Sequence, residues 1–107
     1  MLTRIIAIGV AVAAFGATAE AGGDPVAGRT KARMCQTCHG MDGQSKNPLS
    51  PHLSGQVEAY LVKSLVDYKD GVRTNEQMSV VAPNLSEADI ADLAAYYASI
   101  KVSVTPP

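Results

Sequence analysis

The stretch Cys35-Gln36-Thr37-Cys38-His39 limits what this chain can fold into more than any other feature of its sequence. Two thiols one helical turn apart can bond to the two vinyl groups on one side of a porphyrin, and the histidine that follows can ligate the iron. A disulfide between the cysteines would leave His39 unexplained. A thioredoxin-like motif needs a βαβ context, and a zinc site needs four ligands, for which only His52 remains. The spacing therefore predicts one haem c, attached covalently through Cys35 and Cys38.

The first residues of the chain carry the pattern of a cleaved export signal. Arg4 precedes an apolar run over residues 5–17, and Ala19-Glu20-Ala21 matches the A-x-A pattern of a cleavage site. The run is shorter than the roughly 20 apolar residues of a membrane-spanning helix, although an uncleaved membrane anchor is the competing interpretation. We expect a signal peptide over residues 1–21, a mature monohaem domain over residues 22–107, a periplasmic location in a bacterium, and no stable membrane insertion after cleavage.

The size and composition of the mature chain agree with a fold built around a prosthetic group. A chain of roughly 86 residues has a core that stabilises it only marginally. The whole sequence holds only one Phe, at position 15 within the expected signal peptide, and no Trp, which suits a core whose largest flat apolar group is a haem. The net charge of −1 lacks the basic excess that nucleic-acid binding requires, so we expect no nucleic-acid partner.

Three helical stretches are predicted, and no alternating strand pattern occurs. The first begins at Asp24-Pro25, an N-cap followed by proline at the first helical position, and runs toward the cysteines. The second covers about residues 56–70, after which Gly71 fits a left-handed cap. The third opens with the capping pair Ser86 and Asp89. We therefore predict an all-α fold of three to four helices wrapped around one covalently bound haem.

Met78 is the best candidate for the sixth iron ligand, opposite His39. It ends a polar stretch, residues 73–78, that we interpret as a loop between the second and third helices, so it lacks the periodicity of a core residue. Thioether ligation raises the reduction potential relative to two histidines. The alternatives are that Met78 only packs, or that His52 is the ligand, although a partly exposed loop histidine is the favoured interpretation of His52.

An ordered series of motifs extends from Asp24 to Ile100. Its members are Gly28, Cys35-Gln36-Thr37-Cys38-His39-Gly40, Asp42-Gly43, Pro51-His52-Leu53-Ser54-Gly55-Gln56, Tyr60-Leu61, Met78, and the stretch over residues 85–99. In this series the mature chain resembles the small class I cytochromes c, most closely the cytochrome c553 type and single domains of the dihaem cytochrome c4. The chain departs from c4 in having one C-x-x-C-H motif, and His52 stands where those relatives often carry Lys.

The resemblance implies roles for four positions around the haem. His39 and Met78 would be the axial ligands of the iron. The carbonyl of Pro51 would accept a hydrogen bond from His39 Nδ1 and so orient the ring. Arg73 would neutralise a haem propionate, with a solvated loop arginine as the equal alternative.

The same resemblance gives Gly28 a packing role. It implies that the first helix crosses the last one closely, near Tyr96 or Tyr97. A glycine inside a helix costs about 1 kcal/mol relative to alanine, so such a position needs a reason of this kind.

The function implied is that of a monohaem electron shuttle without an enzymatic reaction of its own. We expect a monomer that meets other redox proteins through a small, weak interface, such as a quinol-oxidising complex, a terminal oxidase or a periplasmic dehydrogenase. A haem subunit bound permanently to a dehydrogenase is one alternative, which the near-neutral charge would suit. A haem enzyme or sensor with a displaceable sixth ligand is the other.

Overall fold

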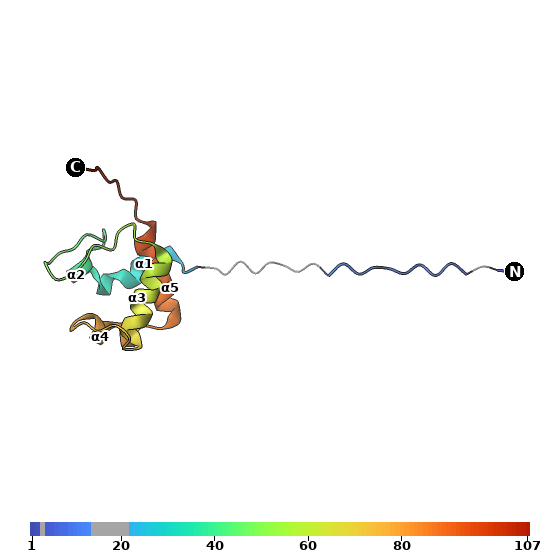
Figure 1. The fold of residues 1–107 in the computed structure, drawn as a ribbon, viewed down its shortest axis with the longest axis horizontal. Coiled ribbons are helices and arrows are strands. Elements are labelled where there is room, and N and C mark those ends of the chain that lie inside the picture. Colours follow the sequence, from blue (N-terminus) through green and yellow to red (C-terminus); the bar gives the residue numbers. More distant parts are fainter. Residues whose placement is uncertain (3, 14–21) are drawn as a thin grey trace.

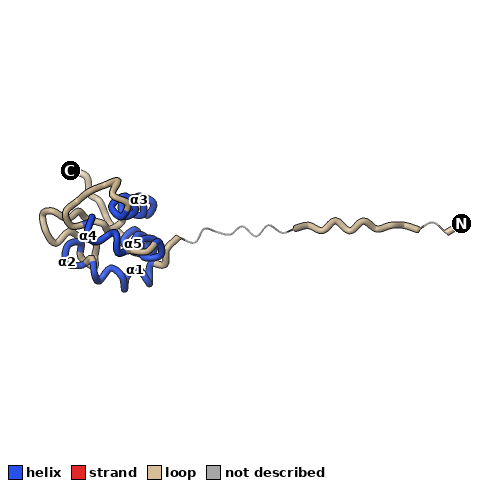
Figure 2. The backbone as a smooth tube through the Cα atoms, turned by 90° about the horizontal axis from the view of Figure 1, so that it is seen from below, coloured by secondary structure: helices blue, strands red, loops and turns tan. Residues whose placement is uncertain are grey.

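The computed structural model describes residues 1–2, 4–13 and 22–107, and within these ranges it contains helices and no strands. The α-helices are α1 (Pro25–Lys31), α2 (Gln36–His39), α3 (Glu58–Lys69), α4 (Met78–Val81) and α5 (Glu87–Ser99), and two 3₁₀ turns cover Ala32–Met34 and Ala82–Asn84 (Figures 1 and 2). The all-α prediction is confirmed. Two of the five α-helices are single turns, so three longer helices remain, in agreement with the three helical stretches predicted from the sequence.

The N-terminal segment of the chain forms no helix over residues 1–2 and 4–13. The predicted cleavage site at Ala19-Glu20-Ala21 lies outside the described residues. Among the helices in the described ranges, none has the length and apolar character needed to cross a membrane.

The first predicted helix, which begins at Asp24-Pro25 and runs toward the cysteines, is divided in the structure into α1 and a 3₁₀ turn. Its first part, α1, begins as expected, because Asp24 Oδ1 accepts from the Val26 N–H at 2.8 Å and Pro25 occupies the first turn. The chain then tightens into the 3₁₀ turn at Ala32–Met34, where the Cys35 N–H donates to the Ala32 carbonyl at 2.9 Å. A 3₁₀ turn has three residues per turn instead of 3.6, so it changes the direction in which the following cysteines point.

The other two long helices agree with the sequence to within two residues. α3 begins at Glu58 and ends at Lys69, and Gly71 follows with a φ of 75°. α5 has the predicted capping box, in which the Asp89 N–H donates to Ser86 Oγ at 3.0 Å and the Ser86 N–H donates to Asp89 Oδ2 at 2.9 Å.

α1 and α5 cross at Gly28, as the resemblance implied. A Cβ atom on Gly28 would lie 1.9 Å from the Asp92 carbonyl oxygen and 2.8 Å from Tyr96 Cβ, so no side chain fits. Lys31 Nζ ties the crossing with ion pairs to Asp92 at 2.6 Å and Asp89 at 2.9 Å. The crossing borders the buried apolar cluster of the protein. The members of this cluster are Ala32, Leu61, Leu85, Ile90, Leu93, Ala94 and Tyr97.

α2 and α4 lie toward the same end of the helical region, away from the α1–α5 crossing, in the ribbon of Figure 1 and in the tube of Figure 2. α4 packs against α3 and the 3₁₀ turn over Ala82–Asn84, whereas α2 packs against the turn over Ala32–Met34. The two elements that hold the predicted haem ligands are therefore anchored to different parts of the fold.

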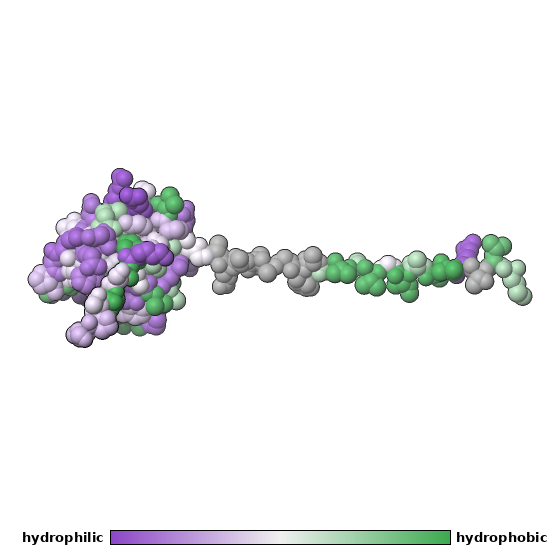
Figure 3. Space-filling view, turned by 90° about the horizontal axis from the view of Figure 1, so that it is seen from above, coloured by the Kyte–Doolittle hydropathy of each residue, from purple (hydrophilic) through white to green (hydrophobic). Residues whose placement is uncertain are grey.

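The face drawn in Figure 3 is mainly hydrophilic over the helical region and carries separate hydrophobic patches.

Candidate functional site: the Cys-x-x-Cys-His segment and Met78

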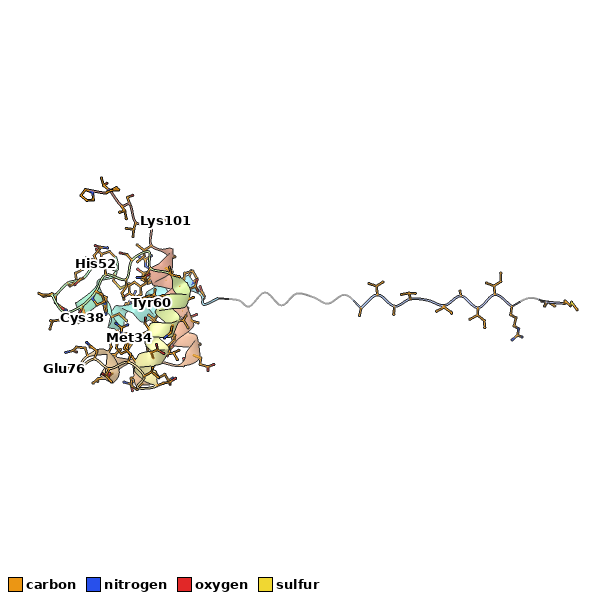
Figure 4. The ribbon with its side chains drawn as sticks, in the orientation of Figure 1. Met34, Cys38, His52, Tyr60, Glu76 and Lys101 are labelled. Carbon is orange, nitrogen blue, oxygen red and sulfur yellow. The ribbon has the colours of Figure 1, made fainter. Side chains whose placement is uncertain are left out.

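The two cysteines of the motif are free thiols at the start of α2. Cys35 lies between the 3₁₀ turn and α2, Cys38 lies within α2, and both are half-buried. Figure 4 shows Cys38 in a position between the loop that carries His52 and the segment that carries Glu76. Burial raises the pKa of the Cys35 thiol. One helical turn between two free thiols is the geometry that two thioether bonds to one porphyrin need.

His39 ends α2 and is 7% exposed. Its Nδ1 lies 2.9 Å from the carbonyl oxygen of Pro51, the contact that the resemblance implied. A carbonyl can only accept, so Nδ1 carries the proton and Nε2 keeps its lone pair. This is the tautomer that a histidine needs to ligate a metal through Nε2.

The loop between α2 and α3 is folded back on the motif by backbone hydrogen bonds. The Lys46 N–H donates to the Cys38 carbonyl at 2.9 Å, and the N–H groups of Leu53 and Ser54 donate to the Gly43 carbonyl at 2.7 and 3.1 Å. Gly43 has a φ of 70°, and a Cβ there would lie 2.6 Å from the Ser54 nitrogen, so glycine is required. These contacts hold Pro51 against His39.

Met78 is half-buried and is the first residue of α4, a helix of a single turn. The prediction that it lies in a loop is therefore wrong. The turn forms because Asn75 caps it. Asn75 Oδ1 accepts from the N–H groups of Gln77 at 2.9 Å and Met78 at 3.1 Å, and the Asn75 N–H donates to Ser79 Oγ at 2.9 Å. Asn75 and Ser79 fix the backbone of Met78. An Asn three residues before Met78 was the available signal for this cap.

Arg73 and His52 have partners of their own in the structure. The Arg73 guanidinium carbon lies 4.7 Å from the centroid of the Tyr68 ring, a cation–π geometry. His52 is exposed, and its Nδ1 accepts from the Ser45 N–H at 2.8 Å. The favoured interpretation of His52 as a loop histidine agrees with this position.

The donor groups of the site fit a haem better than a metal held by protein ligands alone. No cluster of three or more His, Cys, Asp or Glu side chains that could hold a metal ion occurs in the part of the chain that the structure describes. A porphyrin supplies four of the six ligands of its iron, so a haem would need only two further ligands from the chain, such as one histidine nitrogen and one thioether sulfur. Two neighbouring free thiols then serve for attachment.

Comparison with known proteins identifies the class to which this site belongs. Residues 26–101 match the model of the cytochrome c family. The chain belongs to this family, and the family together with the Cys35–His39 motif assigns to it one covalently bound haem c. The resemblance to class I cytochromes c is confirmed.

Three relatives define the likeness more closely. Cytochrome c4 of Pseudomonas aeruginosa is 52% identical over 86 residues, which cover 80% of this chain and 43% of that protein. Cytochrome c-554(548) of Halomonas halodenitrificans is 45% identical over 80 residues, 72% of this chain and 96% of that protein. The crystal structure of reduced cytochrome c4 from Pseudomonas stutzeri superposes with a TM-score of 0.70 at 42% identity, covering 77% of this chain and 48% of the other. The chain thus spans about half the length of the cytochromes c4, and the relatives are named as cytochromes rather than as enzymes.

Sequence reasoning missed the contacts that reach the motif from α5. The Tyr96 hydroxyl donates to the Met41 carbonyl at 2.5 Å, and the Tyr97 hydroxyl donates to the Gly40 carbonyl at 3.3 Å. The sequence placed these tyrosines only near the helix crossing. Their hydroxyl groups could not be assigned because their partners are backbone atoms more than 50 residues away.

Proposed function

We propose that the protein is a periplasmic monohaem cytochrome that carries single electrons between redox proteins, with His39 and Met78 as the axial ligands of the haem iron. The observation that carries the proposal is the pair formed by His39 Nδ1 and the Pro51 carbonyl at 2.9 Å. It fixes the imidazole tautomer beside two free thiols, in a chain that belongs to the cytochrome c family. The haem, when bound, supplies one-electron chemistry at its iron.

The chain's own residues attach, orient and shield that group. Cys35 and Cys38 hold it through bonds that do not exchange, so that it cannot be lost outside the cytoplasm. His39 presents Nε2 to the iron, and the hydrogen bond from Nδ1 to Pro51 raises the basicity of the ring. Met78 offers a neutral thioether on the backbone that Asn75 caps. A neutral sulfur ligand stabilises the ferrous state and favours a high reduction potential.

Met78 is a better candidate than His52 for the second axial position. The carbonyl of Pro51 stands at Nδ1 of His39, the ring nitrogen that would not hold the iron, and His52 is the next residue. The ring of His52 is turned to the Ser45 N–H. Met78 belongs to α4, which packs against α3 and the 3₁₀ turn over Ala82–Asn84, whereas His52 shares the Pro51 loop with the His39 contact. Arg73, five residues earlier, is proposed as a partner of a haem propionate.

The proposed partners are redox proteins that meet the cytochrome briefly. A quinol-oxidising complex, a terminal oxidase or a periplasmic dehydrogenase would fit this role, and the mature domain over residues 22–107 would act as a monomer after removal of residues 1–21. Purification from native periplasm tests whether the carrier is free. We expect a small species on size exclusion. A stable complex with a dehydrogenase would replace the shuttle by a permanent haem subunit.

The occupancy of the sixth position separates a carrier from a haem enzyme or sensor. Carbon monoxide is added to the reduced protein at neutral pH and the visible spectrum is followed. We expect little or slow change, because Met78 occupies the position. Rapid and complete binding would show that the position is open and would contradict the assignment of Met78.

A further inference from the structure

Tyr97 stands out among the residues of α5 because its hydroxyl is buried beside the haem motif. The residue is 3% exposed, and its hydroxyl donates to the Gly40 carbonyl at 3.3 Å. Gly40 directly follows His39. The same hydroxyl faces the sulfur of Cys35, the first residue of the motif. The phenol oxygen thus bonds to the residue that directly follows the motif and faces the first residue of the motif.

The backbone of Tyr97 reaches the other segment that holds His39. Its carbonyl accepts from the Gly55 N–H at 2.9 Å. Gly55 lies four residues after Pro51, whose carbonyl receives the His39 Nδ1 hydrogen. The side chain of Tyr97 therefore holds the chain just after the imidazole, and its main chain holds the loop that orients the same imidazole.

A phenol at this position needs an explanation that packing does not provide. Phenylalanine would fill nearly the same volume in the apolar cluster, and a buried hydroxyl costs free energy unless it is hydrogen-bonded. Once Cys35 is a thioether it has no proton and accepts only weakly, which leaves the Gly40 carbonyl as the partner for the phenol proton. Burial raises the pKa of Tyr97, so the hydroxyl stays protonated and able to donate.

We propose that Tyr97 is a positioning residue for His39, which holds the Gly40 peptide through its hydroxyl and the Pro51 loop through its carbonyl and so sets the direction in which the imidazole faces the iron. The inference rests on the proposed function, in which His39 is the proximal ligand. It predicts that α5 controls the geometry of the iron ligand as well as the packing of the core.

Tyr96 provides a matched control. It is the preceding residue on α5, its ring packs edge-on against that of Tyr97 with centroids 5.1 Å apart, and its hydroxyl also donates to a backbone carbonyl. That carbonyl belongs to Met41, one residue farther from His39, and Tyr96 is only half-buried. Tyr97→Phe and Tyr96→Phe each remove one hydroxyl of the same kind.

The experiment compares the two variants with the wild type as full-length holoproteins. The readouts are the hyperfine-shifted haem methyl resonances of the ferric protein, which respond to the orientation of the axial ligands, and the reduction potential. We expect Tyr97→Phe to keep its covalent haem while its methyl pattern and potential shift by more than those of Tyr96→Phe. Unchanged methyl resonances and potential, with only a lower melting temperature, would show that Tyr97 is merely structural and would overturn the proposal.

A measurement on the wild type keeps the proposal testable if Tyr97→Phe does not fold. In the reduced protein the Tyr97 hydroxyl proton is expected to exchange slowly and to show a nuclear Overhauser effect to Gly40. A rapidly exchanging hydroxyl without this contact would contradict the proposal. Failure of the proposed function is distinguishable, because the wild type itself would then lack the spectrum of a histidine-ligated haem.

Discussion

The α1–α5 crossing and the α2–α4 end of the molecule are held together in different ways. At the crossing, backbone meets backbone at Gly28, and Lys31 bridges two carboxylates of α5. At the other end, single helical turns carry His39 and Met78, and loops held by backbone hydrogen bonds support them. Met78 and both cysteines are only half-buried.

This difference separates what the chain does alone from what it does for a cofactor. The contacts described at the crossing, between Gly28 and α5 and between Lys31 and two carboxylates, are all made within the protein. The α2–α4 end carries Cys35, Cys38, His39 and Met78, the groups for which we propose attachment and ligation of the haem. Changes at the crossing should therefore alter stability, and changes at the α2–α4 end should alter the haem.

The largest effect is expected at the attachment site. Replacement of both Cys35 and Cys38 by alanine removes both thioether bonds, so haem staining after denaturing electrophoresis should disappear. The single Cys35→Ala variant is the control, since Cys38 can still form one bond and should retain covalent haem. Persistent covalent haem in the double variant would refute the assignment of the motif.

Gly28→Ala should be the most damaging single change at the crossing. The new Cβ would lie 1.9 Å from the Asp92 carbonyl oxygen, so the helices must separate. We expect a loss of about 3 kcal/mol in the free energy of unfolding, the upper end of the usual cost of overpacking, measured with denaturant. Gly71→Ala is the control, because it meets no atom within 4 Å and has only its φ of 75° to strain, at about 1 kcal/mol. Equal losses would mean that the crossing is not closely packed.

Met78→Ala should change the haem and leave the crossing intact. Loss of the thioether opens the sixth position, so carbon monoxide should bind readily. Axial ligands set the potential over a range of roughly 0.8 V, and we expect the reduction potential of this variant to fall by at least about 80 mV, a tenth of that range. Met34→Ala, at an exposed methionine beside the motif, should do neither. A wild-type potential in Met78→Ala would leave Met78 as a packing residue.

Acid should weaken the crossing by a smaller amount. The Ser86 N–H, followed by Lys31, lowers the pKa of Asp89 to about 2, and Lys31, followed by the Asp24 N–H, lowers the pKa of Asp92. Carboxylates of lowered pKa stabilise the fold above their unfolded pKa of about 3.9, and that stabilisation is lost as the pH falls through the folded value.

Melting temperatures measured from pH 5 to pH 2 test this. The wild type should lose stability steeply below about pH 4, whereas Asp92→Asn should lose less over the same range because one of the two carboxylates no longer titrates. Parallel curves for the two proteins would show that Asp92 does not contribute through its charge.

Local signals made much of the fold predictable from the sequence. Asp24-Pro25, Gly71 and the pair Ser86 and Asp89 act through neighbouring atoms, and the structure has the cap or the left-handed turn expected at each position. The break after α1 was not predicted, because helical spacing does not distinguish an α-helix from a 3₁₀ turn over three residues. The turn at Met78 was missed because its cap, Asn75, was read as part of a polar loop.

The candidate site also has one part that the sequence predicts and another part that it does not. The motif at residues 35–39 is contiguous, so its chemistry could be read directly, and the Pro51 contact came from the family resemblance. The hydroxyl contacts of Tyr96 and Tyr97 with Met41 and Gly40 depend on how α5 docks on the motif. Tertiary contacts of this kind have no local signature in the sequence.

The most direct test of ligation of the haem iron by His39 and Met78 is the visible spectrum of the purified holoprotein in both oxidation states. We predict a low-spin c-type haem whose ferric form shows the weak long-wavelength band of a sulfur–iron bond, because His39 and Met78 ligate the iron. A low-spin spectrum without that band, or a high-spin ferric haem, would contradict ligation by Met78 and with it the proposed electron carrier.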